Sequence, residues 1–75
     1  MSTVRKLNES ALRGIYDAYM HEAFPPAELK PLAVMLRLME RGRYLCYGYY
    51  RNGRLAAYAF FYRHDSRVLL LDYFP

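Results

Sequence analysis

The chain has 75 residues, a formal net charge of +4 and a composition that is 55% hydrophobic, with nine Tyr, four Phe and one Cys. So many apolar and aromatic residues exclude an intrinsically disordered chain, and a single cysteine excludes a disulfide framework and a cysteine-rich metal site. No apolar stretch approaches the roughly 20 residues that span a bilayer, and the N-terminus lacks the apolar segment of a signal peptide. We therefore expect one small domain over residues 1–75, in a reducing cytoplasm and with no membrane partner.

Two helices are expected in the first half of the chain. Cap-type residues at positions 8–10 precede a helix over residues 10–23, and Pro25 and Pro26 end it because neither can continue the hydrogen-bond ladder. A second helix is expected over residues 31–41, with Pro31 in its first position and Gly42 as a left-handed stop. Apolar side chains recur at helical spacing in both segments: Leu12, Ile15, Tyr16, Tyr19 and Ala23, then Leu32, Met35, Leu36 and Met39.

The second half of the chain predicts strands. Residues 44–51 and 54–63 flank Asn52-Gly53, the strongest short signal for a β-hairpin. A two-residue turn there predicts three cross-strand pairs: Arg51 with Arg54, Tyr49 with Ala56, and Tyr47 with Tyr58. A third strand is expected over residues 68–74, and residues 3–7 form a short extended start. The fold class is therefore α/β in the broad sense (α+β), in the order β-α-α-β-β-β, with an antiparallel meander and two helices.

Both faces of the predicted meander are largely apolar, and two helices can cover only one of them. Strand alternation places Tyr58, Phe60 and Tyr62 on the same face as Tyr47 and Tyr49. The last strand is apolar enough to be buried on both faces. We therefore expect the chain to be the front part of a larger protein, in which another segment covers the meander.

Four stretches, taken in order, resemble the N-terminal half of the GNAT superfamily of N-acetyltransferases. They are Val4-Arg5-Lys6-Leu7, then Ala23-Phe24-Pro25-Pro26 with Glu28-Leu29-Lys30-Pro31, then residues 44–63, and finally Leu69-Leu70-Leu71-Asp72-Tyr73-Phe74. The resemblance implies transfer of an acetyl group from acetyl-CoA to an amine substrate. In that family the final strand leads into a Gly-rich loop that opens a helix, and the backbone there holds the pyrophosphate. Because the glycines of this chain lie singly, the acetyl-CoA-binding half is expected to be absent and the chain alone inactive.

Four candidate site residues follow from this resemblance. Asp72, a carboxylate within an apolar strand, is a candidate base or docking charge for an amine. Its alternative is an Asp at a strand end that is solvated or paired with a nearby arginine such as Arg54 or Arg63. Phe24 and Glu28 lie in a region that lines the acceptor cleft in such enzymes; otherwise they are a hydrophobic plug and a helix-start carboxylate. The backbone of Phe74 would contact acetyl-CoA, although Pro75 lacks the backbone donor expected after it.

The remaining polar and aromatic residues favour structural roles. Cys46 has no activating neighbour in its strand and is interpreted as a packed small hydrophobe, while His21 and His64 lack partners at metal-ligand spacing. The strand tyrosines are typical of sheet packing, and the basic residues are scattered, so nucleic acid is not an expected partner. One alternative function remains open: a dimeric interaction module that pairs through its aromatic sheet face and last strand.

Overall fold

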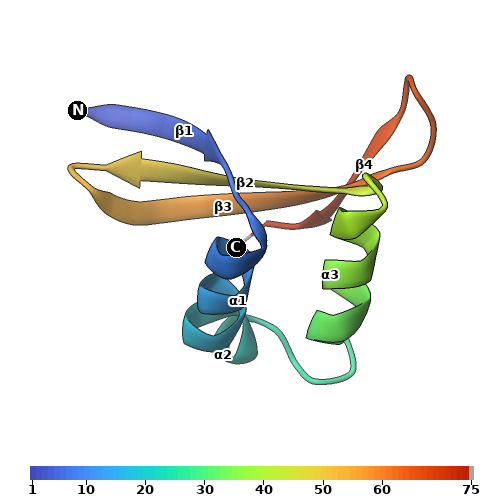
Figure 1. The fold of residues 1–75 in the computed structure, drawn as a ribbon. Helices are drawn as coiled ribbons and strands as arrows, with labels where there is room; N and C mark the ends of the chain where they lie inside the picture. Colours follow the sequence, from blue (N-terminus) through green and yellow to red (C-terminus); the bar gives the residue numbers. More distant parts are fainter. Residues whose placement is uncertain (75) are drawn as a thin grey trace.

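The computed structural model describes residues 1–74, and its helices lie on one side of a four-stranded antiparallel sheet (Figure 1). The strands β1 (Ser2–Lys6), β2 (Tyr44–Arg51), β3 (Arg54–Arg63) and β4 (Leu69–Tyr73) lie side by side in that order. The α+β class and the order β-α-α-β-β-β are thus confirmed. The extended start of the chain is itself a strand of the sheet, because it pairs with β2 and adds a fourth strand to the predicted meander.

The first helix runs without interruption over three segments: α1 (Glu9–Ile15), the π-helical η1 (Tyr16–Met20) and α2 (His21–Ala23). It begins at Glu9, one residue earlier than predicted, with Asn8 as its cap: the side chain of Asn8 accepts a hydrogen bond from the backbone N–H of Ala11. The second helix, α3 (Leu32–Glu40), starts one residue later than predicted, with Pro31 as its cap. Gly42 follows α3 with a φ of +73°, the left-handed stop that the sequence indicates.

The π-helical turn changes which residues of the first helix reach the core. Tyr19 was expected on the buried stripe but is 49% exposed, whereas Met20 is fully buried. A π-turn holds more residues than an α-turn, so each residue after its start is rotated backwards relative to an ideal α-helix. The prediction for Tyr19 was wrong because the apolar spacing contains no sign of this extra residue.

A β-bulge corrects the predicted pairing of the hairpin. Arg51 pairs with Arg54 as expected, and Asn52 and Gly53 both have positive φ, as a tight two-residue turn requires. The register then shifts, so that Tyr49 faces Ala57 and Ala56 is the extra residue. Because one inserted residue moves every later side chain to the other face, the two predicted tyrosine pairs beyond the turn and the predicted faces of β3 were wrong.

The core lies between the helices and the inner face of the sheet. Its six largest fully buried side chains come from both layers: Tyr44, Phe60, Leu12, Met20, Met35 and Cys46. The interpretation of Cys46 as a packed small hydrophobe is therefore confirmed. Among residues 1–74, none of the helices has the length and apolarity that crossing a bilayer needs.

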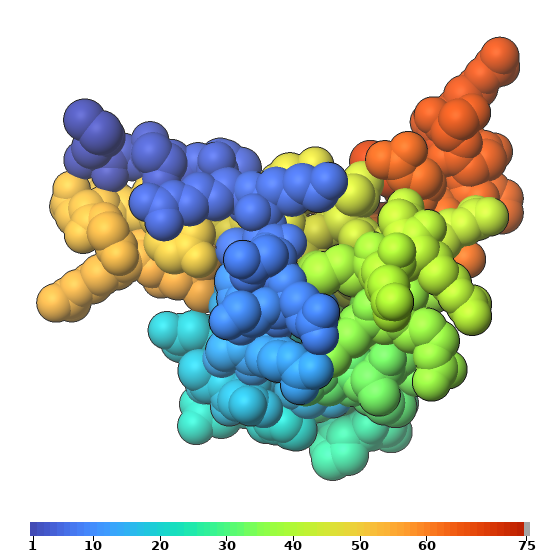
Figure 2. All heavy atoms as spheres, in the orientation of Figure 1, coloured from blue at the N-terminus to red at the C-terminus, as the bar shows by residue number. Residues whose placement is uncertain are grey.

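The outer face of the sheet lies on the side away from the helices, and its apolar residues include Val4, Tyr47, Tyr49, Ala57, Ala59, Phe61 and Leu71. Val4 is 68% exposed and Leu71 is 59% exposed, although both are apolar strand residues. Figure 2 shows that the turn after β3 projects from the body. β4 is the last strand of the sheet, so within residues 1–74 its outer edge pairs with no other strand. The sequence expectation that two helices cover one face only is met by this arrangement.

Candidate functional site

Polar side chains converge where β4 meets the connection between the two helices. Lys30 Nζ lies 2.7 Å from Asp72 Oδ2, and the hydroxyl of Tyr44 donates to the same oxygen at 2.5 Å. The side chains of Lys30 and Asp72 are 29% and 26% exposed, so the pair is reached by solvent only in part. We call Lys30, Tyr44, Asp72 and Tyr73 the Asp72 cluster. The cation that pairs with Asp72 is thus Lys30, in place of the two arginines considered from the sequence.

A second β-bulge positions the carboxylate of this cluster. Phe61 faces Leu71 and Phe60 faces Tyr73, so Asp72 is an extra residue in β4. In a regular strand, neighbouring residues point to opposite faces. Here Asp72 bonds to Tyr44 of the inner face, while Tyr73 packs against the ring of Phe60 on that same face. The bulge therefore lets two successive residues of the edge strand serve one site, a use of bulges that is common beside active sites.

Tyr73 links this strand to the helix connection. Its hydroxyl donates to the carbonyl of Glu28 at 2.9 Å and accepts from the backbone N–H of Lys30 at 2.5 Å. The ring of Phe24 meets the ring of Tyr73 edge to face, with centroids 4.9 Å apart. The structure therefore brings the region of Phe24 and Glu28 to Asp72, although Glu28 takes part through its backbone and its side chain is exposed.

The electrostatics of the Asp72 cluster favour neutral partners around one ion pair. Burial, followed by the hydrogen bond to Asp72, raises the pKa of Tyr44 well above its ordinary value, so its hydroxyl remains a donor. Burial and the same carboxylate raise the pKa of Cys46 to about 12, so its thiol stays protonated and is not a nucleophile. Lys30 supplies the positive charge opposite Asp72. The geometry suits a carboxylate that anchors an ammonium group.

The other predicted residues lie outside this cluster. Phe74 follows β4, and its exposed side chain lines a shallow hollow on the outer face with Val4 and Tyr49. Pro75 lies outside the described residues, and the expectation about its missing backbone N–H therefore lies outside them too. The ring of His21 packs edge to face on Tyr16. Within residues 1–74, no three His, Cys, Asp or Glu side chains are grouped as a metal site requires.

Sequence reasoning missed three members of the Asp72 cluster. Lys30 was quoted only as part of a family-like stretch, and Tyr44 and Tyr73 were counted among tyrosines that pack the sheet. One signal was present in the sequence: an Asp-Tyr pair that interrupts an apolar strand gives that strand two polar groups in need of partners. What the sequence did not contain was the identity of those partners. No family model, curated protein or solved structure shows a significant match to this chain.

Proposed function

We propose that this chain is the N-terminal part of an acetyl-CoA-dependent N-acetyltransferase of the GNAT type, acting on an amine substrate in the cytoplasm. The observation that supports this most is the ion pair of Lys30 and Asp72, a carboxylate that already holds an ammonium group at the last strand of the meander. The order of the elements and the four family-like stretches of sequence support the same proposal.

In this proposal Asp72 docks the amine substrate, and Phe24 shapes the acceptor side of the cleft through its contact with Tyr73. Acetyl-CoA supplies a thioester carbonyl that the neutral amine attacks, and attack is helped where that carbonyl is polarised. A docked ammonium must release its proton before it can react. Because Lys30 already holds Oδ2 of Asp72, a substrate amine that binds there competes with Lys30 for the carboxylate.

The described residues offer no phosphate-binding loop for acetyl-CoA. Gly14 lies within the first helix, Gly42 and Gly53 serve single turns, and Gly48 lies in β2, so none of them forms a glycine cluster. The proposal therefore assigns the cofactor to a segment beyond Phe74 in the intact protein. That segment would also cover the exposed leucines of β4.

Three experiments test this proposal. Isothermal titration of the 75-residue chain with acetyl-CoA should show no micromolar binding. Such binding would contradict the proposal that the acetyl-CoA site lies in a segment beyond Phe74. The reading frame downstream of Pro75 should encode a Gly-rich loop that opens a helix. The product of that longer frame should release CoA thiol from acetyl-CoA when primary amines are added, and should lose most of that activity in Asp72→Asn. A longer frame that lacks the loop would remove the enzyme proposal.

A second candidate function is supported by the open edge of the sheet. β4 carries three consecutive leucines, whereas the opposite edge strand, β1, carries Arg5 and Lys6. Charges on an edge strand discourage pairing with another chain. The one charged residue of β4, Asp72, is paired with Lys30, so its three leucines leave the edge open to pairing. Two copies could therefore join through β4 across a two-fold axis. A stable dimer in sedimentation experiments supports this function, and a monomer at high concentration opposes it.

A further inference from the structure

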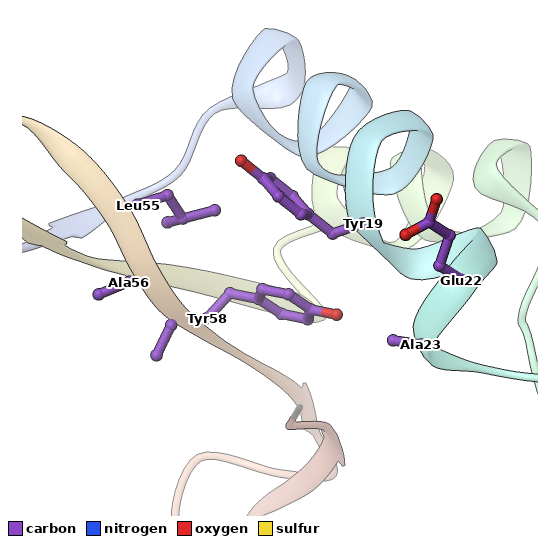
Figure 3. A pocket seen from close by; sticks show the side chains of 7 residues that line it. Tyr19, Glu22, Ala23, Leu55, Ala56 and Tyr58 are labelled. Carbon is purple, nitrogen blue, oxygen red and sulfur yellow. The ribbon is translucent and has the colours of Figure 1, made fainter.

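An open groove of about 370 Å³ lies between the end of the first helix and the start of β3 (Figure 3). It is lined by Tyr19, Glu22, Ala23, Leu55, Ala56, Ala57 and Tyr58. Its volume falls within the range of sites that hold small organic ligands. None of these residues belongs to the Asp72 cluster, so the groove is a separate feature of the molecule.

The hydroxyl of Tyr58 is the first sign that this groove is built to bind something. Tyr58 is only 5% exposed, and its oxygen has no hydrogen-bond partner among the residues described. A buried hydroxyl without a partner costs about 1–3 kcal/mol, and such groups are rare enough in folded proteins to need an explanation. In Figure 3 the ring points across the groove, with its hydroxyl toward Ala23 on the helix. The oxygen is closed to solvent in the free protein, so a ligand in the groove supplies the absent partner only when the Tyr58 ring turns slightly toward it.

Two irregularities of the backbone border the same groove. The π-helical turn rotates Tyr19 out of the core, and this residue is 49% exposed where an ideal helix would bury it. The β-bulge of the hairpin places its extra residue, Ala56, on the opposite wall. π-turns and β-bulges both occur frequently at functional sites. Here the π-helical turn lies on the helix side of the groove and the β-bulge lies on its strand side.

The chemistry of the lining selects a cation with an apolar body. Glu22 contributes an exposed carboxylate at the rim, and the hydroxyl oxygens of Tyr19 and Tyr58 can accept hydrogen bonds. The faces of the two aromatic rings also attract positive charge. Leu55 and the two alanines of β3 give an apolar floor for hydrocarbon, while Glu22 disfavours an anion.

We propose that this groove binds a small organic cation, a protonated primary amine on an aromatic or branched aliphatic body. The ammonium lies between the carboxylate of Glu22 and the hydroxyl of Tyr58, and the apolar body lies against Leu55. This binding site shares no residue with the Asp72 cluster and does not depend on acetyltransferase activity.

Phenethylamine is a suitable probe, with phenethyl alcohol as its uncharged analogue and hydrocinnamate as its anionic one. Titration of the full chain, followed by amide chemical shifts in heteronuclear NMR, should move the signals of Ala23, Ala56 and Ala57 in a saturable way. The alcohol should bind about tenfold more weakly, which is the loss of one charge-assisted hydrogen bond. Equal binding of amine and alcohol, or shifts confined to other parts of the sheet, would overturn the proposal, as would the absence of a saturable response.

Matched variants separate a ligand role from a structural one. Glu22→Gln should weaken phenethylamine binding about tenfold, whereas Glu40→Gln, the same change on an exposed glutamate of α3, should leave it unaltered. Tyr58→Phe should weaken binding by about threefold or more, since one neutral hydrogen bond is lost. The melting temperature of the free Tyr58→Phe protein should stay the same or rise. If Tyr58→Phe or Glu22→Gln binds phenethylamine as tightly as the unaltered chain does, the proposed position of the ammonium is wrong.

Discussion

Lys30 and Asp72 lie 42 residues apart in the chain, yet their charged groups are 2.7 Å apart in the folded protein. Their contact ties the connection between the helices to the edge strand β4, which within residues 1–74 pairs with β3 alone. Tyr73, the next residue, binds the same connection through two hydrogen bonds. The attachment of β4 to the helix connection therefore depends on these few polar contacts and on the packing of the Tyr73 ring against Phe24.

Replacement of either member of the ion pair should loosen β4. The pair is partly exposed, so we expect Asp72→Asn or Lys30→Met to lower the free energy of unfolding by about 1 kcal/mol, between the values for exposed and buried pairs. For a domain of this size that corresponds to a fall in melting temperature of roughly 4–8 °C. Urea unfolding followed by circular dichroism measures the change. The double variant should lose less unfolding free energy than the two single variants lose together. Strict additivity would show that the two residues do not interact.

Tyr73 and Tyr58 give a matched test of what a buried hydroxyl contributes. Both are almost fully buried, but Tyr73 has two backbone partners and Tyr58 has none among the described residues. Tyr73→Phe leaves two partly buried backbone groups, Glu28 C=O and Lys30 N–H, without this partner and should destabilise the fold by about 1–3 kcal/mol. Tyr58→Phe should be neutral or stabilising. Similar losses in both variants would mean that the ring environment, and not the hydrogen bonds, determines the effect.

The sequence predicted β2 and β3 with the bounds that the structure has, because the Asn-Gly turn and the strand-forming residues around it all act locally. It did not predict the two bulges or the π-turn. Each of these inserts one residue into a regular helix or strand. The spacing of the apolar residues is compatible with the element both with and without that insertion. Ala56 illustrates this point, since its small apolar side chain fits either register of the hairpin.

The candidate site was predictable only in part for a related reason. Asp72 stands out in an apolar strand, and its need for a partner can be inferred from that position. The choice of Lys30 over an arginine of β3 depends on where the helix connection passes the sheet. That path is set by the packing of Phe24 and Tyr73, a contact between residues far apart in the chain that no local pattern records.

The open edge of β4 predicts an effect of charge on self-association. Leu71→Lys places a charge on an apolar residue that is 59% exposed, so it should weaken any dimer without unfolding the chain. Val4→Lys makes the same change on the outer face at the opposite edge, β1, and serves as the control. Sedimentation velocity over a range of concentrations measures the association. If Val4→Lys dissociates the dimer and Leu71→Lys does not, the interface lies at β1.

Cys46 predicts a loss of stability at alkaline pH. Its pKa is raised from 9.0 to about 12 in the folded protein, so between these values the unfolded chain releases the thiol proton and the folded chain keeps it. The free energy of unfolding should therefore fall above pH 9, with a contribution from this thiol of about 1.4 kcal/mol per pH unit. Tyr44 acts in the same direction because its pKa is raised from 10.0. Cys46→Ala should make the pH profile shallower even though it lowers the absolute stability, and an unchanged slope would contradict the assignment.

Two glycines predict opposite responses to the same substitution. A Cβ on Gly48 would lie 2.9 Å from the ring of Tyr50 and 3.1 Å from side-chain carbons of Leu55 and Leu7, so those side chains must move. We expect Gly48→Ala to cost about 1–3 kcal/mol, as overpacked cores do. Gly14 is exposed in α1 with nothing near its Cβ position, so Gly14→Ala should stabilise the first helix by about 0.5–1 kcal/mol. A stable Gly48→Ala protein would mean that β2 can move away from Leu7, which thermal unfolding of the two variants side by side would reveal.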